Sequence, residues 1–246
     1  MRPLSSSDIL RIWDLGQDHH PVDRALRLLW LASPEASWEE LAALPVGRRD
    51  ALLGALRAST FGGTMNARAA CPACATAVEL TLEAADLRVE PPARVVDTLE
   101  VDGIALRFRL PNTLDLAAVA RLGAQSGEPR AALSLLLARC VLEARRGEAV
   151  IAPEDLPESI LTRLSEAMAE QDPQAEVLLD LVCPACRHPW QALLDIVDFV
   201  WREVSAGAAR VLGEVHTLAR AYHWREGDIL AMSSRRRQAY LEMATA

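Results

Sequence analysis

Apolar residues recur every three or four positions through the first sixty residues, which is the period of an amphipathic helix. A serine among residues 5–7 can cap one helix, and Pro21 suits the first turn of a second. The stretch SWEE at 37–40 has capping-box spacing, and GRRDALLGALR at 47–57 predicts a fourth helix. Residues 1–66 are therefore expected to form a helical N-terminal region.

The pattern changes to a period of two at two later places. Residues 77–83 alternate apolar and acidic or polar side chains, as a half-buried strand does. Farther on, Asp102 and Gly103 have the chemistry of a two-residue hairpin turn. Such a turn places five apolar residues on one face: Leu99, Val101, Ile104, Leu106 and Phe108. A β-hairpin is therefore predicted here.

Helical spacing returns between about residues 112 and 172, in three pieces. The middle piece, PRAALSLLLARCVLEARR at 129–146, is expected to be one helix with Cys140 as a buried core thiol. Strand-like segments then follow on either side of residue 185. From about residue 198 a long amphipathic helix runs to His223, and two short helices complete a C-terminal arm over 198–246.

The tetrapeptide CPAC occurs twice, and each copy lies between predicted β segments. Its four cysteines are Cys71, Cys74, Cys183 and Cys186. A redox pair normally stands at the start of a helix, whereas each copy here leads into a strand. Two CxxC turns together supply the four sulfurs of a closed structural zinc site, so we expect one shared Zn²⁺. A dithiol oxidoreductase and unmetallated turns remain as alternatives.

These patterns predict an α+β protein that is mostly helical. Its small β core, residues 67–197, is expected to be of zinc-ribbon type, fastened by the two CPAC turns and carrying the helical insertion at about 112–172. The 246 residues are 51% hydrophobic, which is enough for a sizeable core. With no long apolar run, we expect a soluble, cytoplasmic protein without a membrane span.

The net charge of −8 argues against a general nucleic-acid binder, because such binding depends on accumulated positive charge. The C-terminal arm nevertheless holds a run of three arginines near aromatic residues. Candidate partner-binding residues are Tyr222, Trp224, Arg235, Arg236, Arg237 and Tyr240. They could dock on an acidic partner, form a solvated face, or bind nucleic acid. No histidine, serine or cysteine has a convincing catalytic partner, so no small-molecule substrate is expected.

Four stretches in order, LPVGRRDALLGALRASTFG, CPACATAVELTLEAADL, DPQAEVLLDLVCPACRHPWQALLDIVDFVW and VHTLARAYHWREGDILAMSSRRRQAYLEM, resemble one family of baseplate-associated proteins. This family belongs to contractile phage tails and extracellular contractile injection systems, and includes T-even-phage-like baseplate hub assembly proteins. The resemblance rests on Gly47, Arg48, Arg49, Asp50, Phe61, Gly62, the four CPAC cysteines, Trp190, Asp195, Phe199, Trp201, His216, Leu218, Ala219, Tyr222, Trp224, Ile229, Leu230, Arg236, Arg237 and Tyr240. The chain departs from the family where Arg187 stands after a CPAC turn, a position at which glycine is common.

The resemblance implies a non-enzymatic role in building or bracing a baseplate, with hub, spike or wedge proteins as partners and a possible place in the assembled particle. Assembly chaperone for the hub or spike is one form of this role. The alternative function is a zinc-ribbon adaptor that binds nucleic acid or a transcription complex through the arginines of the arm.

Overall fold

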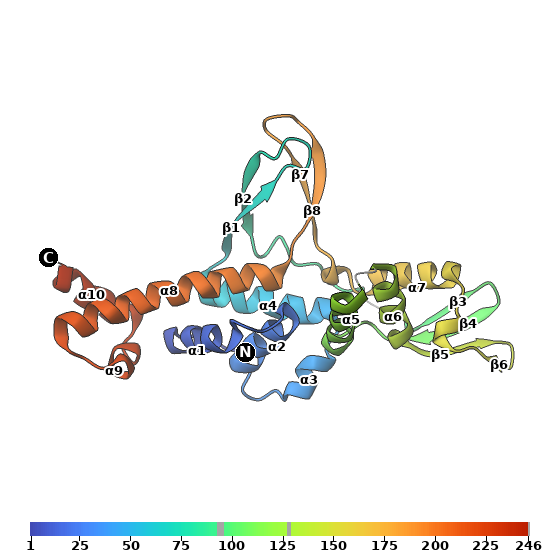
Figure 1. Ribbon diagram of the computed structural model, residues 1–246, viewed down its shortest axis with the longest axis horizontal. Coiled ribbons are helices and arrows are strands. Elements are labelled where there is room, and N and C mark those ends of the chain that lie inside the picture. The colour runs from blue at the N-terminus through green and yellow to red at the C-terminus, as the bar shows by residue number, and fades with distance from the viewer. Residues whose placement is uncertain (93–95, 127–128, 246) are drawn as a thin grey trace. The chain divides into compact units, whose positions relative to one another are not determined.

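The computed structural model describes residues 1–92, 96–126 and 129–245, and more than half of the chain is helical. The remainder includes three small antiparallel sheets. Two compact units are present (Figure 1). One combines residues 1–35, 53–62 and 195–246, and the other combines 36–52 and 63–194. The division at residues 66 and 197 stays a prediction.

The first unit is all helical. It contains α1 (Ser6–Gly16), α2 (Pro21–Ala32), the second half of α4 (Val46–Phe61), α8 (Ile196–Tyr222), α9 (Glu226–Leu230) and α10 (Ser234–Thr245). The predicted starts of α1 and α2 are confirmed, because Ser5 and Asp8 form a capping box and Pro21 occupies the first turn of α2. The long amphipathic helix is also confirmed. Helix α1 ends against it at Gly16, where a Cβ would lie 2.3 Å from the ring of Trp201.

Buried arginines connect the helices of this unit. Arg57 on α4 is almost fully buried and makes a two-pronged ion pair with Glu203 on α8, with both N–O distances 2.6 Å. Arg237 on α10 is 1% exposed and donates to Glu214 on α8 over 2.9 Å. Both arginine charges are therefore paired with carboxylates inside the unit.

The second unit contains the sheets and, besides the start of α4, four α-helices and two short 3₁₀ turns. These are α3 (Trp38–Ala43), α5 (Thr113–Ser126), α6 (Pro129–Cys140) and α7 (Glu158–Gln171), with short 3₁₀ turns at Pro153–Asp155 and Pro173–Ala175. The strands are β1 (Thr64–Ala70), β2 (Ala77–Glu83), β3 (Thr98–Val101), β4 (Ile104–Phe108), β5 (Val141–Arg146), β6 (Ala149–Val150), β7 (Leu178–Val182) and β8 (Pro189–Leu193). The predicted capping box of Ser37 and Glu40 starts α3.

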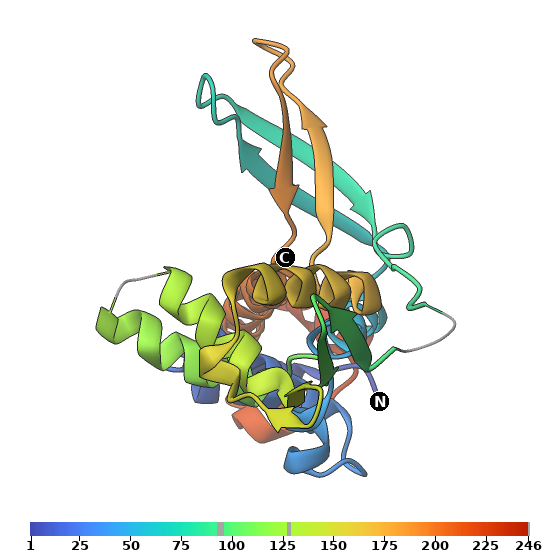
Figure 2. The ribbon, with the colours of Figure 1, turned by 90° about the vertical axis from the view of Figure 1, so that its right-hand side faces the viewer.

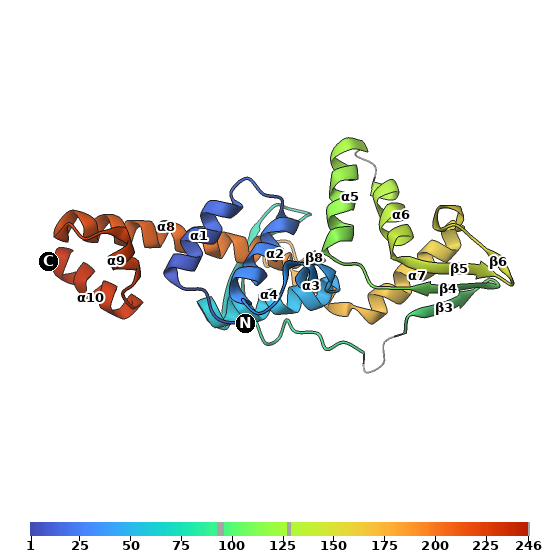
Figure 3. The ribbon, with the colours of Figure 1, turned by 90° about the horizontal axis from the view of Figure 1, so that it is seen from below.

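The sheet β3-β4-β5-β6 carries the core of this unit, and α6 and α7 lie beside it (Figure 3). The predicted hairpin is confirmed: Val101 pairs with Ile104 and Leu99 with Leu106, around a turn in which Gly103 has a φ of 72°. Cys140 is fully buried in this core, as predicted.

Residues 141–150 differ from the predicted helical insertion. Helix α6 ends at Cys140, and the chain continues as β5, which pairs with β4, and β6. Val141 and Ala144 are buried in the core, while Gly147 makes the β5–β6 turn with a φ of 61°. Pairing with an available edge of β4 and burial of two side chains outweigh the helical preference of this alanine- and arginine-containing segment.

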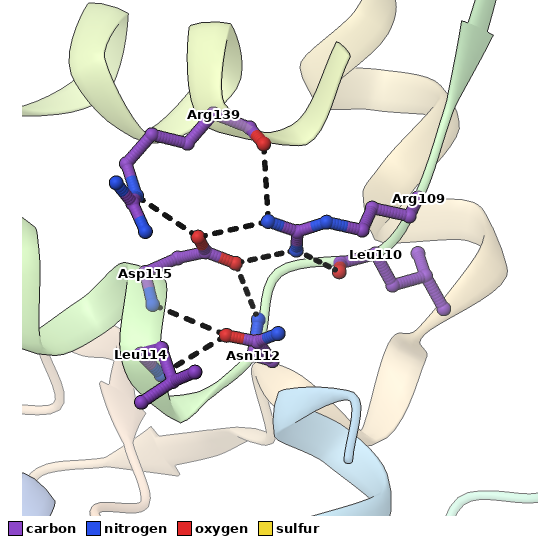
Figure 4. A network of polar contacts seen from close by, with 6 residues as sticks. All are labelled: Arg109, Leu110, Asn112, Leu114, Asp115 and Arg139. Atoms are coloured by element: carbon purple, nitrogen blue, oxygen red, sulfur yellow. Dashed lines mark hydrogen bonds and ion pairs between the residues drawn. The ribbon is translucent and has the colours of Figure 1, made fainter. Parts of the chain in front are cut away.

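A buried carboxylate holds the start of α5 to the ends of β4 and α6 (Figure 4). The side chain of Asp115 is fully buried and accepts from Arg109 over 2.5 Å and from Arg139 over 2.9 Å. It also accepts from the backbone N–H of Asn112, whose side-chain oxygen in turn accepts from the backbone N–H groups of Leu114 and Asp115. The network therefore caps a helix and pairs one carboxylate with two arginines.

Replacing Asp115 with asparagine is expected to lower the free energy of unfolding by about 1–3 kcal/mol at pH 7. Burial disfavours the carboxylate, but hydrogen bonds from Arg109 and from the backbone of Asn112 outweigh it and lower the pKa of Asp115. This stabilisation is complete above the pKa of the unfolded chain, about 3.9, and is lost as the pH falls through the lowered native value. Urea unfolding at pH 7 and pH 3 tests this expectation.

The matched control is Asp155→Asn, an exposed aspartate whose replacement should change stability by less than about 0.5 kcal/mol. The loss of unfolding free energy caused by Asp115→Asn should be smaller at pH 3 than at pH 7. A deficit of equal size at both pH values would mean that the charge of Asp115 contributes nothing.

Candidate metal centre

Two hairpins bring the four CPAC cysteines together. Strands β1 and β2 pair from Thr64–Glu83 to Ala70–Ala77, and β7 and β8 pair from Leu178–Leu193 to Val182–Pro189. The predicted β segments on both sides of each CPAC are thus confirmed. The two hairpins lie side by side (Figures 1 and 2), with a CPAC turn at the tip of each. Neither turn stands at a helix N-terminus, which is where a reactive redox cysteine would be expected.

Both CPAC turns have the same backbone geometry. In the first, the N–H of Cys71 donates to the carbonyl of Thr76, and the N–H of Ala75 donates back to Cys71. In the second, Cys183 and the carbonyl of His188 form the equivalent bond, and Arg187 donates back to Cys183. The first cysteine of each turn is buried and the last is exposed. Each turn therefore presents two sulfurs on one side.

The four sulfur atoms all lie within 4.8 Å of one another. The Sγ atoms of Cys71 and Cys186 are 3.7 Å apart, and those of Cys74 and Cys183 are 3.6 Å apart. A tetrahedral ion with metal–sulfur bonds of about 2.3 Å separates its sulfurs by about 3.8 Å. All four thiols are free. The four sulfurs and their spacing fit one metal ion, and the four predicted metal ligands lie in one cluster.

The thiols have different electrostatic surroundings. Hydrogen bonds from the hydroxyl and backbone N–H of Thr76 lower the pKa of Cys74 to about 6. The backbone N–H of His188 acts in the same direction on Cys186, but the neighbouring sulfurs outweigh it and raise the pKa of Cys186 to about 12. One thiolate thus opposes the ionisation of the next. A divalent cation would remove this conflict, since a coordinated thiol is deprotonated outright.

Arg187 does not disturb the turn, although glycine is common at its position. Its φ is 59°, and Ala75 occupies the same place in the first turn with a φ of 58°. A left-handed conformation costs a non-glycine residue roughly 1–2 kcal/mol. Both turns therefore have the same geometry even though each places a non-glycine residue in this strained conformation.

Replacing Arg187 with glycine is expected to stabilise the protein by about 1 kcal/mol, because glycine adopts the left-handed conformation freely. Thermal melting of the metal-loaded protein measures the effect. The control is Ala185→Gly within the same turn, where φ is not positive and glycine should destabilise by about 0.5–1 kcal/mol. Equal shifts for the two variants would contradict the proposed strain.

The candidate partner residues lie at the end of the C-terminal arm. They form an aromatic group, two exposed arginines and one buried arginine. Tyr222 and Trp224 stack with ring centroids 4.5 Å apart, and Tyr240 meets the ring of Trp224 edge-on at 4.8 Å. Arg236 lies over the ring of Tyr240, 5.7 Å from its centroid, and Arg235 is exposed. Arg237 was expected on the exposed basic side of the helix, but it is buried. Its guanidinium donates to Glu214, Ser6 and the carbonyl of Met232.

The sequence did not reveal which arginines are structural. Arg57 and Arg237 are buried and pair with the partly exposed Glu203 and Glu214, which lie far along the chain. Arg109 and Arg139 pair with the buried Asp115. The position of Arg237, three residues after Ser234 and next to Arg236, carries no local signal of burial.

Taken together, the features define a mixed helical and sheet protein in which two hairpins that are distant in sequence bring four cysteines close together. The family described as "T4 bacteriophage base plate protein" matches residues 33–201, which is more than half of the chain and includes both CPAC turns. The chain belongs to this family. No curated protein and no solved structure matches it. Among the described residues, no helix combines the length and apolar composition that a membrane crossing needs.

Proposed function

We propose that the protein is a non-enzymatic structural or assembly component of the baseplate of a contractile, phage-tail-like injection system. The family match over residues 33–201 carries this proposal, because it spans the whole paired-hairpin element. The partners are hub, spike or wedge proteins, and an assembly chaperone of the hub or spike is one form of the role. The protein acts in the bacterial cytoplasm during assembly and can remain in the particle.

The metal in this proposal is a structural Zn²⁺ held by Cys71, Cys74, Cys183 and Cys186. Four thiolates in a closed tetrahedral set are typical of structural zinc, which has no redox chemistry and needs no open position. Holding the two turns together closes a loop of more than a hundred residues between Cys74 and Cys183. The metal's role is thus to fix one hairpin against the other, in the manner of a zinc ribbon.

Partner contacts in this proposal come from the end of the arm. Tyr222, Trp224 and Tyr240 supply a rigid aromatic group, and Arg235 and Arg236 supply exposed positive charge. Aromatic and arginine side chains are the usual centres of protein interfaces. The alternative of a nucleic-acid adaptor has less support, because burial of Arg237 removes one of the three arginines on which it rests.

Deletion of the gene in a strain that makes sheathed particles tests the role. We expect particles without complete baseplates, and recovery when the gene is supplied again. Co-purification with hub, spike or wedge proteins from the complemented strain tests whether the protein binds them. Normal numbers of baseplate-bearing particles in the deletion strain would overturn the proposal.

A further inference from the structure

The two hairpins differ on their exposed faces. Along all four strands, half-buried and exposed positions alternate, apart from the buried Met65 at the start of β1. Each hairpin therefore has one partly covered face and one face open to solvent.

The exposed face of β1–β2 consists mostly of polar cross-strand pairs. Three of its four pairs are polar and hydrogen-bonded: Thr64 with Glu83 at 2.9 Å, Asn66 with Thr81 at 3.3 Å, and Arg68 with Glu79 at 2.6 Å. The fourth pair joins two small residues, Ala70 and Ala77. An antiparallel sheet that faces water on one side normally has this kind of surface. This face needs no partner.

The exposed face of β7–β8, which we call the β7–β8 outer face, is apolar at both ends. It consists of Leu178, Asp180, Val182, Pro189, Gln191 and Leu193. Leu178 pairs directly with Leu193, and Val182 pairs directly with Pro189, so the apolar side chains are neighbours by register. Leu178, Val182 and Leu193 remain 44%, 63% and 61% exposed.

One charge lies in the middle of this face. Asp180 pairs with Gln191 in the register, and its Oδ1 atom accepts from the Nε2 atom of Gln191 over 3.0 Å. The carboxylate is therefore flanked along both strands by apolar pairs. Exposed apolar pairs on both sides of one polar pair are typical of interaction surfaces rather than of solvent-facing sheet.

We propose that the β7–β8 outer face docks a protein partner that presents apolar side chains around one arginine or lysine, which pairs with Asp180. Charge complementarity carries this choice of partner. If a second copy of the chain covered the same face about a twofold axis through its centre, the two Asp180 carboxylates would face each other between sheets packed about 10 Å apart. Two like charges buried between the sheets oppose association. A positive group opposite Asp180 removes the conflict.

This surface goes beyond the proposed function and uses other residues than the aromatic group of the arm. A hairpin of five pairs is only about 17 Å long, which is less than a standard interface of about 800 Å² per partner needs. The β7–β8 outer face therefore supplies the apolar centre of a larger contact. Its five-pair register fixes the side chains before binding, which reduces the entropy lost on association.

Site-specific photo-crosslinking tests the proposal. We would place p-benzoylphenylalanine at Gln191 in the full-length protein, in cells that produce the particles, and identify the crosslinked peptide by mass spectrometry. The matched control is the same probe at Thr81, which has the central position on the polar face of β1–β2. We expect at least about tenfold more product from Gln191, in a peptide of another protein that contains arginine or lysine among apolar residues.

Charge exchange then tests the predicted pair. Asp180→Arg should reduce the crosslink at least about tenfold, and changing the partner's basic residue to aspartate should restore it. Asp180 is exposed, so the metal content and melting temperature of Asp180→Arg should match those of the wild type. If Asp180→Arg lost metal or melted at a lower temperature, Leu193→Ser would replace it as the test variant. Leu193→Ser changes no charge, and it should also reduce the crosslink from Gln191.

Three results would overturn the proposal: equal crosslinking from Gln191 and Thr81, a crosslink to another copy of this chain, or a crosslink that Asp180→Arg leaves unchanged. These results do not depend on the baseplate role. Normal particles in a deletion strain would refute that role while leaving a specific Gln191 crosslink in place.

Discussion

Replacing Cys183 with serine is expected to abolish stoichiometric metal binding and to separate the two CPAC hairpins. Cys183 is fully buried, and its sulfur is one of the four in the cluster, 3.6 Å from that of Cys74. Zinc binding contributes on the order of 10 kcal/mol to the folding of small zinc domains, so no other single change should cost as much. The half-buried faces of two-stranded hairpins give little stability without it.

Metal content by elemental analysis and limited proteolysis of residues 63–84 and 177–194 measure the result. We expect about one Zn²⁺ per wild-type chain, much less in Cys183→Ser, and faster cleavage in both hairpins of the variant. Chelation of the wild type should give the same cleavage pattern.

Cys140→Ala is the matched control, because it removes the one cysteine outside the cluster. Burial raises the pKa of Cys140 to about 11, so it remains a neutral thiol in the core. The variant should lose only about 1 kcal/mol from the missing sulfur and keep its zinc. Wild-type protein purified without chelators and free of zinc, or containing iron in its place, would refute the structural zinc site.

The sequence was sufficient wherever the signal is local. The Asp102–Gly103 turn, the serine cap of α1, the capping box at Ser37, and the amphipathic period of α8 each depend on residues within a few positions, and each is confirmed. The metal cluster is long-range, but it could be predicted because two identical turns each offer half of a tetrahedral set.

The sequence was insufficient where tertiary contacts decide. Residues 141–146 follow a helix without an obvious break and become a strand because β4 offers an edge to pair with. The run Arg235 to Arg237 gives no local reason why the third side chain is buried and the first two are exposed. That difference depends on the distance from α10 to Glu214 on α8, which no short pattern encodes. The distinction matters, because it separates the arginines that can contact a partner from the one that holds the arm together.

Replacing Glu214 with alanine is expected to destabilise the packing of α10 on α8 by about 3–5 kcal/mol, because the charge of Arg237 would remain buried without its carboxylate. The side chain of Arg237 is 2% exposed, so water cannot replace the lost partner. Arg237→Met should cost less, about 1–3 kcal/mol, since Glu214 keeps its ion pair with Arg210 and some exposure to solvent. The double variant Glu214→Ala/Arg237→Met should recover part of the loss, because it leaves no unpaired charge.

Hydrogen exchange of the α10 amides measures these differences directly, since local opening of α10 need not unfold the rest of the unit. Arg235→Met is the matched control: the same substitution two positions earlier, at an exposed side chain, should change protection by less than about 0.5 kcal/mol. The two arginine variants should also differ in function. Arg235→Met should weaken co-purification with baseplate partners while leaving exchange unchanged, whereas Arg237→Met should weaken it only to the extent that α10 opens. If Arg237→Met left the exchange of α10 at the wild-type rate, the buried ion pair would not be what holds the arm, and Arg237 would have to be counted with the partner-binding residues.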